Sequence, residues 1–232
     1  PPLISKSFGL NHHTNRDIAY FSHVDSEKNL IVIGTTEKDS TFTDILTLKL
    51  DKENNLIWQK KHSIETNLSY DIPLKSYINS NDEIYIIGRS SFNQSYSNGV
   101  IFIIKYNKDG NIIYNKTLGN INGTEFLDFG YFDSELNADG SLNVVYSPNN
   151  YQSGTTPHLF KFLKFSADGE LLNSFSKEII KQDIIGKIIS DNFYFFIREI
   201  DITWTNIKYK IYKIDASGNL SVNDVNNQDF NK

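Results

Sequence analysis

The chain has 232 residues, 39% of them hydrophobic and 22% charged, with a formal net charge of −5 at pH 7. This hydrophobic content is enough for a substantial core, whereas the lysines and carboxylates interleave and form no basic stripe, which argues against nucleic-acid binding. Cysteine is absent, which excludes disulfides, thiolate metal sites and cysteine nucleophiles. No stretch approaches the roughly 20 apolar residues that a membrane helix needs.

Residues 1–9 are predicted to form an extra outer strand. They end in Ser-Phe-Gly, and a similar Thr-Leu-Gly closes a predicted hairpin at residues 117–119. The sequence begins at Pro1 and contains no methionine. We therefore expect a chain that has been processed or trimmed, which is compatible with a removed export signal.

Two kinds of predicted β-hairpin alternate along the rest of the chain. The first begins at an aspartate and leads through a turn to an apolar strand. Its aspartates step by 54, 57 and 55 residues and are Asp17, Asp71, Asp128 and Asp183. The second leads from an apolar strand through a lysine and a tight turn to another strand. Its lysines step by 56, 59 and 49 residues and are Lys49, Lys105, Lys164 and Lys213. A repeating period of roughly 50 residues predicts a repeat architecture.

The tight turn of the second hairpin contains a position that favours a positive φ angle. Three copies place a glycine there, namely Gly110, Gly169 and Gly218, and glycine adopts this conformation freely. The first copy has Asn54, and asparagine is the next most tolerant residue. The acidic residues of these turns lack the alternating oxygen donors and the later glutamate of a calcium loop, so we interpret them as turn formers.

The repeats predict an all-β fold of the β-propeller type, made of four-stranded antiparallel blades. The third strand of each repeat is apolar at nearly every position, as a strand covered on both faces must be, and blades stacked around an axis meet that requirement. We predict one domain over residues 1–232, with repeats at about 17–62, 71–118, 128–176 and 183–225. About four blades are therefore visible. They form either a small closed ring or, as we favour, an arc of a larger propeller.

One resemblance supports this fold. The features of the repeat follow in the order Phe-Gly, polar link, Asp, strand, turn, three apolar residues with Gly, and finally a Lys-containing hairpin with Trp. This repeat pattern resembles the bacterial β-propeller repeats of exported proteins of Bacteroidota. Residues 8–58 and 71–119 match it most closely. The third and fourth repeats depart from it, because Tyr146 and Ile197 stand near the place of the glycine. The resemblance implies export to the periplasm, outer membrane or cell surface.

Candidate binding residues lie in the loops between the second and third strands of the repeats. These loops are rich in Ser, Asn and Gly, and each contains at least one aromatic residue, a residue type that often anchors recognition surfaces. The predicted binding residues are Phe42, Phe92, Tyr96, Tyr151 and Trp204. In the alternative interpretation each ring folds down over the edge of its own blade.

The sequence predicts no catalytic residue, metal site or cofactor. The nucleophile pattern G-x-S-x-G and the phosphate-binding pattern G-x-x-x-x-G-K-[ST] do not occur, and the histidines are too scattered to form a metal site. The four repeated aspartates either line a channel that binds a cation or, as we favour, accept hydrogen bonds from backbone amides of the adjoining link.

The leading functional hypothesis is a non-catalytic, exported protein-interaction module with a partner in the bacterial envelope. A more specific form of it is a subunit or cargo of the type IX secretion or gliding machinery of Bacteroidota. One alternative is a propeller that binds or cleaves glycans, with aromatic loops stacking on sugars and a carboxylate pair for acid–base chemistry. Another is a purely architectural segment of a larger protein.

Overall fold

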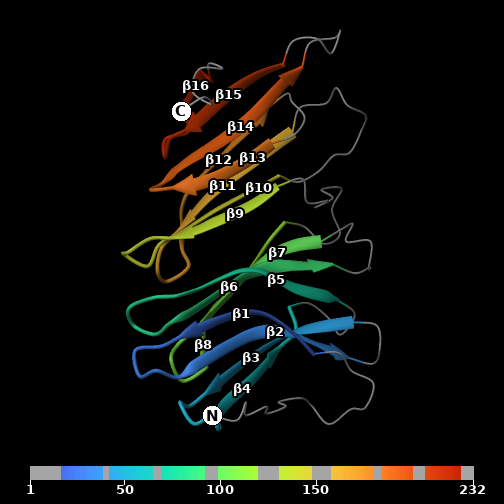
Figure 1. Cartoon of the computed structure of the whole chain (residues 1–232), viewed down its shortest axis with the longest axis vertical. Helices are drawn as coiled ribbons and strands as arrows, with labels where there is room; N and C mark the ends of the chain where they lie inside the picture. The colour runs from blue at the N-terminus through green and yellow to red at the C-terminus, as the bar shows by residue number, and fades with distance from the viewer. Residues whose placement is uncertain are drawn as a thin grey trace. The chain divides into compact units, whose positions relative to one another are not determined.

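The structure, a computed structural model, describes residues 17–38, 42–64, 69–91, 99–119, 131–147, 158–179, 184–200 and 207–225. Within these residues every regular element is a β-strand. The chain divides into two compact units, unit 1 (residues 1–124) and unit 2 (residues 125–232). Each unit contains two blades of four strands (Figure 1). The described part of the chain includes no helix that could cross a membrane.

The strands follow the predicted repeats. Blade 1 consists of β1 (Asp17–Val24), β2 (Leu30–Lys38), β3 (Phe42–Leu50) and β4 (Leu56–His62). Blade 2 consists of β5 (Tyr70–Ile78), β6 (Ile84–Ser91), β7 (Gly99–Tyr106) and β8 (Ile112–Leu118). Blade 3 consists of β9 (Tyr131–Leu136), β10 (Leu142–Ser147), β11 (His158–Phe165) and β12 (Leu171–Ile179). Blade 4 consists of β13 (Ile184–Ile189), β14 (Asn192–Ile200), β15 (Ile207–Ile214) and β16 (Leu220–Val225).

Each blade pairs its strands in chain order, and every pairing within a blade is antiparallel. In unit 1 the two blades are also joined by one parallel bridge, between Thr43 and Tyr70. The predicted fold class is thereby confirmed as all-β, with the four-stranded antiparallel blades of a β-propeller. The predicted strand at residues 1–9 lies outside the described residues. The single domain over residues 1–232 and the choice between ring and arc stay predictions.

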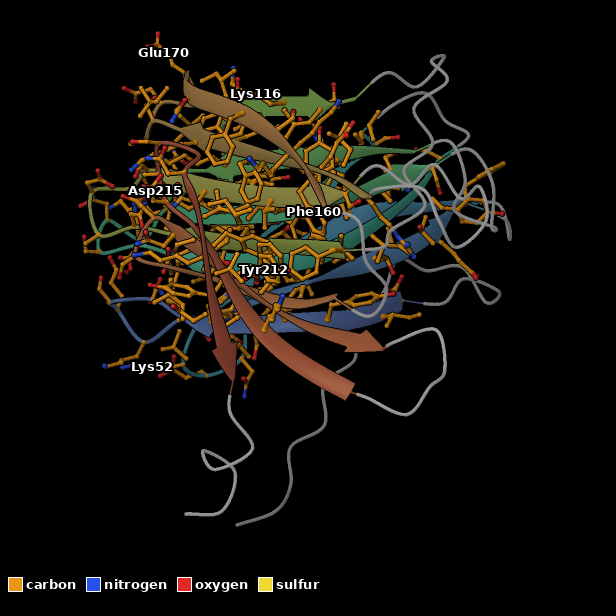
Figure 2. The ribbon with its side chains drawn as sticks, turned by 90° about the horizontal axis from the view of Figure 1, so that it is seen from above. Lys52, Lys116, Phe160, Glu170, Tyr212 and Asp215 are labelled. Atoms are coloured by element: carbon orange, nitrogen blue, oxygen red, sulfur yellow. The ribbon has the colours of Figure 1, made fainter. Side chains whose placement is uncertain are left out.

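The cores lie between the two blades of each unit, because both faces of the middle strands are apolar. In unit 1 the buried side chains are mostly isoleucines, and they include Ile31, Ile33, Ile45, Ile84, Ile86 and Ile104. In unit 2 they are mostly phenylalanines, and they include Phe160, Phe162, Phe193 and Phe195. Figure 2 shows Phe160 and Tyr212 among the strands of unit 2, while Glu170 and Asp215 lie at the end where the tight turns are.

The tight turns have the predicted backbone conformation. Gly110, Gly169 and Gly218 have φ angles of 76°, 82° and 84°, and Asn54 has a φ angle of 61°. The first residue of a turn bonds the turn's own amides. Asp215 Oδ1, for example, accepts hydrogen bonds from the backbone N–H groups of Ser217 and Asn219, both at 2.9 Å. These contacts agree with the interpretation of the acidic residues as turn formers.

Candidate functional site

In each unit the last strand of one blade meets the tight turn of the next, and we call this contact the seam. In the unit 1 seam, Trp58 on β4 donates a hydrogen bond from its indole Nε1 to the backbone oxygen of Lys108, at 3.2 Å. The indole lies against Gly110, where a Cβ atom would be 3.0 Å from Trp58 Cδ2. Lys49 Nζ donates to the same oxygen at 3.1 Å. A tryptophan therefore fills the unit 1 seam.

The unit 2 seam has an asparagine where the unit 1 seam has the tryptophan. Asn173 follows its turn residue Gly169 by four positions, as Trp58 follows Asn54. Its Nδ2 atom donates to the backbone oxygen of Ala216 at 2.9 Å. Ala216 precedes Gly218 by two positions, as Lys108 precedes Gly110, so the same carbonyl of the turn accepts a hydrogen bond in both seams.

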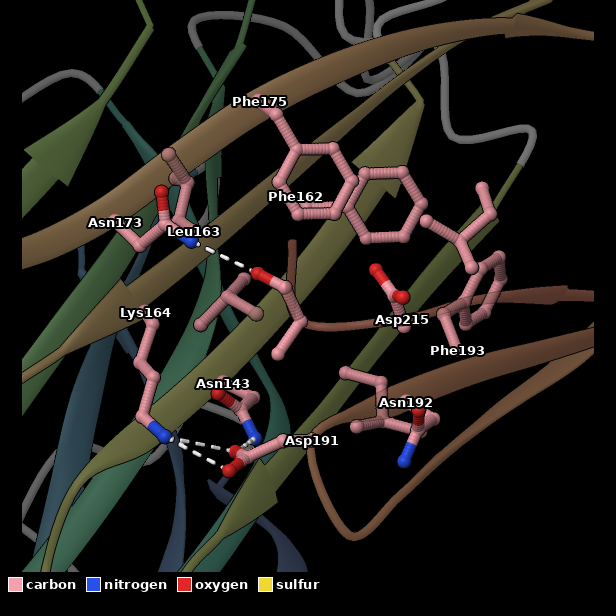
Figure 3. Close-up of a pocket in the computed structure, with 14 residues that line it drawn as sticks. Asn143, Phe162, Leu163, Lys164, Asn173, Phe175, Asp191, Asn192, Phe193 and Asp215 are labelled. Carbon is pink, nitrogen blue, oxygen red and sulfur yellow. Dashed lines mark hydrogen bonds and ion pairs between the residues drawn. The ribbon is translucent and has the colours of Figure 1, made fainter. Parts of the chain in front are cut away.

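Asn173 is one of the residues that line a cavity of about 70 Å³ in the unit 2 seam. We call it the seam pocket, and Figure 3 shows its lining. The apolar part of the lining consists of Val144, Phe162, Leu163, Phe175, Ile188, Phe193, Ile214 and Ala216. The polar part consists of Asn143, Lys164, Asn173, Asp191, Asn192 and Asp215.

The walls of the seam pocket are firmly packed. Phe162 and Phe175 stack with ring centroids 4.6 Å apart, and Phe162 meets Phe193 edge to face at 5.2 Å. Phe162, Phe193, Ile188 and Ile214 are all buried. Offset and edge-to-face aromatic contacts favour one arrangement of the rings. The apolar wall is therefore formed before any ligand binds.

Lys164 and Asp191 form an ion pair in the polar part of the pocket. Lys164 Nζ lies 2.9 Å from both carboxylate oxygens of Asp191, and Asn143 Nδ2 donates to Oδ1 at 2.7 Å. The hydrogen bond from Lys164, followed by that from Asn143, lowers the pKa of Asp191. The pKa of Asp215 is also lowered, chiefly by the hydrogen bond from the Asn219 side chain. Both carboxylates are therefore charged at neutral pH.

Asp191 reaches Lys164 because the β13–β14 turn is short. Ile189 pairs directly with Asn192, so Ser190 and Asp191 form a two-residue turn with φ angles of 49° and 62°. Glu135 on β9 accepts the backbone N–H of Ser190 at 3.1 Å and thereby fixes the turn against blade 3. In unit 1 the repeated lysines Lys49 and Lys105 instead pair with Asp25 and Glu83 of their own blades.

The predicted loop residues are only partly described. Phe42 is half-buried at the start of β3, and its ring centroid lies 5.2 Å from that of Tyr70 on blade 2. Phe92, Tyr96, Tyr151 and Trp204 lie outside the described residues. A shared recognition patch made by the five rings stays a prediction.

The repeated aspartates differ from one another. Asp71 is fully buried and accepts hydrogen bonds from the backbone N–H of Ile64 at 2.9 Å and from Ser90 Oγ at 2.5 Å. Ile64 precedes β5 in the link between the blades, so at Asp71 the expected bond to a link amide is present. Asp17 is exposed. Asp128 and Asp183 lie outside the described residues.

Burial raises the pKa of Asp71 to about 6, although hydrogen bonds from Ser90 and Ile64 act in the opposite direction. The residues that the structure describes contain no group of three His, Cys, Asp or Glu side chains placed to hold a metal ion.

Comparison by sequence finds no family model and no curated protein that matches the chain. Comparison by structure finds an acylaminoacyl peptidase from Pyrococcus horikoshii with a TM-score of 0.51 and 10% identity, over 90% of this chain and 33% of that chain. An acylaminoacyl peptidase in complex with Z-Gly-Gly-Phe-chloromethyl ketone gives a TM-score of 0.51 and 11% identity, over 89% of this chain and 32% of that chain. An endo-1,4-beta-xylanase from Bacteroides thetaiotaomicron gives a TM-score of 0.44 and 13% identity, over 90% of this chain and 75% of that chain.

The chain thus spans about a third of the length of the two peptidases. At these identities the likeness concerns the fold alone. The blades and this likeness together define a protein of propeller-type fold.

Sequence reasoning missed the seam pocket. It placed function on the longer loops, whereas the pocket lies beside the short turns. The sequence feature that could have indicated the pocket is the repeat position held by Trp58 in the first repeat and by Asn173 in the third. A small side chain at a position where another repeat has a large one can leave space between packed blades.

Proposed function

We propose that the chain is a non-catalytic protein-binding module and that its seam pocket takes one side chain of a protein partner. The observation that carries this function is a preformed, aromatic-walled cavity in the unit 2 seam, lined by Asn173 at the position where the unit 1 seam holds a tryptophan. Interfaces commonly bind through a few anchor side chains that fill such pockets.

The size of the pocket supports a side chain as its occupant. Pockets for whole small molecules usually measure at least about 300 Å³. The seam pocket, at about 70 Å³, has room for part of a side chain and not for a whole small molecule. Glycan binding through the predicted aromatic loops is a separate alternative, and it rests mainly on residues outside the described ranges.

The proposed setting is the bacterial envelope. The resemblance of the repeats to those of exported Bacteroidota propellers supports export and a partner at the outer membrane or cell surface. A subunit or cargo of a type IX secretion or gliding machinery is the specific form of this proposal. Recovery of the native chain in the envelope fraction after cell fractionation would support the setting, and recovery in the cytoplasm alone would contradict it.

Peptide display tests the binding function. Random peptides on phage are selected against the immobilised full chain, and binding of the enriched peptides is measured to wild type and to Asn173→Trp. We expect the variant to bind at least about tenfold more weakly, equivalent to about 1.4 kcal/mol, because the introduced indole occupies the pocket.

Val222→Trp is the matched control. Val222 occupies the same repeat position on blade 4 and is 44% exposed, so an indole there adds the same side chain outside the pocket. Equal binding to wild type and to both variants would contradict a binding role of the seam pocket.

A further inference from the structure

We infer that the side chain taken by the seam pocket is the indole of a tryptophan from the partner. This assignment rests on the proposed protein-binding function and adds the chemical class of the anchor. The unit 1 seam already holds an indole at the equivalent place, so the protein itself shows which group fits between two of its blades.

Two features that hold the indole of Trp58 recur in the unit 2 seam. The first is an acceptor, since the backbone oxygen of Ala216 has the place in the turn that the oxygen of Lys108 has in unit 1. The second is a turn glycine without a side chain, since Gly218 has the place of Gly110 and a positive φ angle. Gly218 has the Phe175 ring beside it, where Gly110 has the Trp58 indole. The unit 2 seam thus keeps the carbonyl that accepts an indole N–H and an aromatic contact at the turn, and it holds no indole of its own.

The aromatic wall of the pocket suits a second ring. Phe175 lies beside Gly218, with its Cγ atom 3.4 Å from where a Cβ atom would stand. Its partner Phe162 is stacked on it and buried. An entering indole would therefore meet an aromatic surface, with the favourable offset or edge contacts that aromatic pairs make.

The Asn173 amide must move for the indole to bind. The amide donates a hydrogen bond to the backbone oxygen of Ala216, and this hydrogen bond is exposed to solvent. The amide can therefore rotate toward the solvent and form hydrogen bonds with water instead. The cavity is smaller than an indole, and only part of the ring enters. Trp58 is likewise only half-buried in its seam.

The charge of the pocket favours a neutral N–H donor. Asp191 and Asp215 are both ionised at neutral pH, whereas Lys164 is the cation that lines the pocket with them. The charge of Lys213 also acts on Asp215, so the charges around the pocket balance and a neutral group adds no unpaired charge. An indole presents its N–H as a donor and has no acceptor oxygen.

Indole and 1-methylindole test this assignment directly. The full chain is labelled at its isoleucine, leucine and valine methyl groups, and each compound is titrated while methyl NMR shifts are followed. We expect saturable shifts for Val144, Leu163, Ile188 and Ile214 with indole. We expect binding about three- to tenfold weaker with 1-methylindole, which cannot donate the hydrogen bond to Ala216.

Two variants complete the test. Asn173→Trp should abolish the indole shifts, and its methyl spectrum and melting temperature report whether it folds. Asn173→Ala should tighten indole binding, because no amide competes for the Ala216 oxygen. Absence of saturable shifts at the four methyl-bearing residues, or equal binding of the two compounds, would overturn the assignment.

The peptide selection separates this assignment from the proposed function. Enriched peptides that share a tryptophan and lose binding to Asn173→Trp support both. Enriched peptides with an aliphatic anchor that also lose binding to Asn173→Trp leave the binding function in place and overturn the indole. Enriched peptides that bind Asn173→Trp as well as wild type overturn both.

Discussion

Asp71 is a carboxyl group whose charge is costly in the folded protein. It is fully buried, and burial raises its pKa from 3.8 to about 6. The folded protein therefore holds this proton more tightly than the unfolded chain does. The stabilisation that this provides is complete below about pH 4 and is lost as the pH rises through about 6.

Replacing Asp71 by asparagine should remove this pH dependence. The amide can keep both contacts, with Oδ1 accepting from Ile64 N–H and Nδ2 donating to Ser90 Oγ, while no charge is buried. We expect Asp71→Asn to be more stable than wild type at pH 7, by up to roughly 3 kcal/mol, and the difference to shrink toward pH 4. Urea unfolding at both pH values measures it. A constant difference between the two proteins across this range would contradict the raised pKa.

In two of the blades, a glycine on the second strand lies opposite a β-bulge in the first strand of the same blade. In blade 2, Gly88 on β6 pairs with Pro73 on β5, immediately before the register shift to Lys75. A Cβ atom at Gly88 would collide with the backbone oxygen of Ile72. The bulge brings the backbone of β5 onto the glycine, as glycine's missing side chain allows.

Blade 1 repeats this arrangement, and blades 3 and 4 lack it. Gly34 on β2 faces a bulge of β1, and a Cβ atom there would collide with the backbone oxygen of Ile18. In blade 3 the register between β9 and β10 is regular, and Tyr146 pairs with Phe132. In blade 4 the register between β13 and β14 is regular as well, and Ile197 pairs with Ile184. Tyr146 and Ile197 can therefore replace the glycine without breaking the strand pattern.

Gly88→Ala should destabilise unit 1. The added methyl group meets backbone on one side and the Phe102 ring on the other, so β5 and β6 must separate locally. We expect a loss of about 1–3 kcal/mol in the free energy of unfolding, the usual range for overpacking a filled site. Thermal unfolding followed by circular dichroism measures this loss. An unchanged melting temperature would show that the bulge can relax, contrary to the close contact described.

Much of the fold could be predicted from the sequence, because it is local. The four-strand repeats follow from apolar runs and turn residues, and the positive φ angle of Asn54 follows from its place in the glycine column. The bulges could not be predicted, since they depend on how two strands pair. The seam pocket could not be predicted either, because it depends on which side chain of one blade meets which turn of the next.

At the scale of the whole molecule, two units with the same blade design differ in how their seams are filled. The unit 1 seam is closed by Trp58, whereas the unit 2 seam is left open at Asn173. A repeat protein can change function at one seam in this way while the strands, turns and cores that form the blades stay the same. The proposed binding role therefore depends on a difference between its repeats.

Calorimetry can measure the binding of display-selected peptides to wild type, Asn173→Trp and Val222→Trp side by side, with all three proteins shown to be folded. We expect wild type and Val222→Trp to bind with the same affinity, and Asn173→Trp to bind about tenfold or more weakly. Undiminished binding to Asn173→Trp would contradict the proposed binding role.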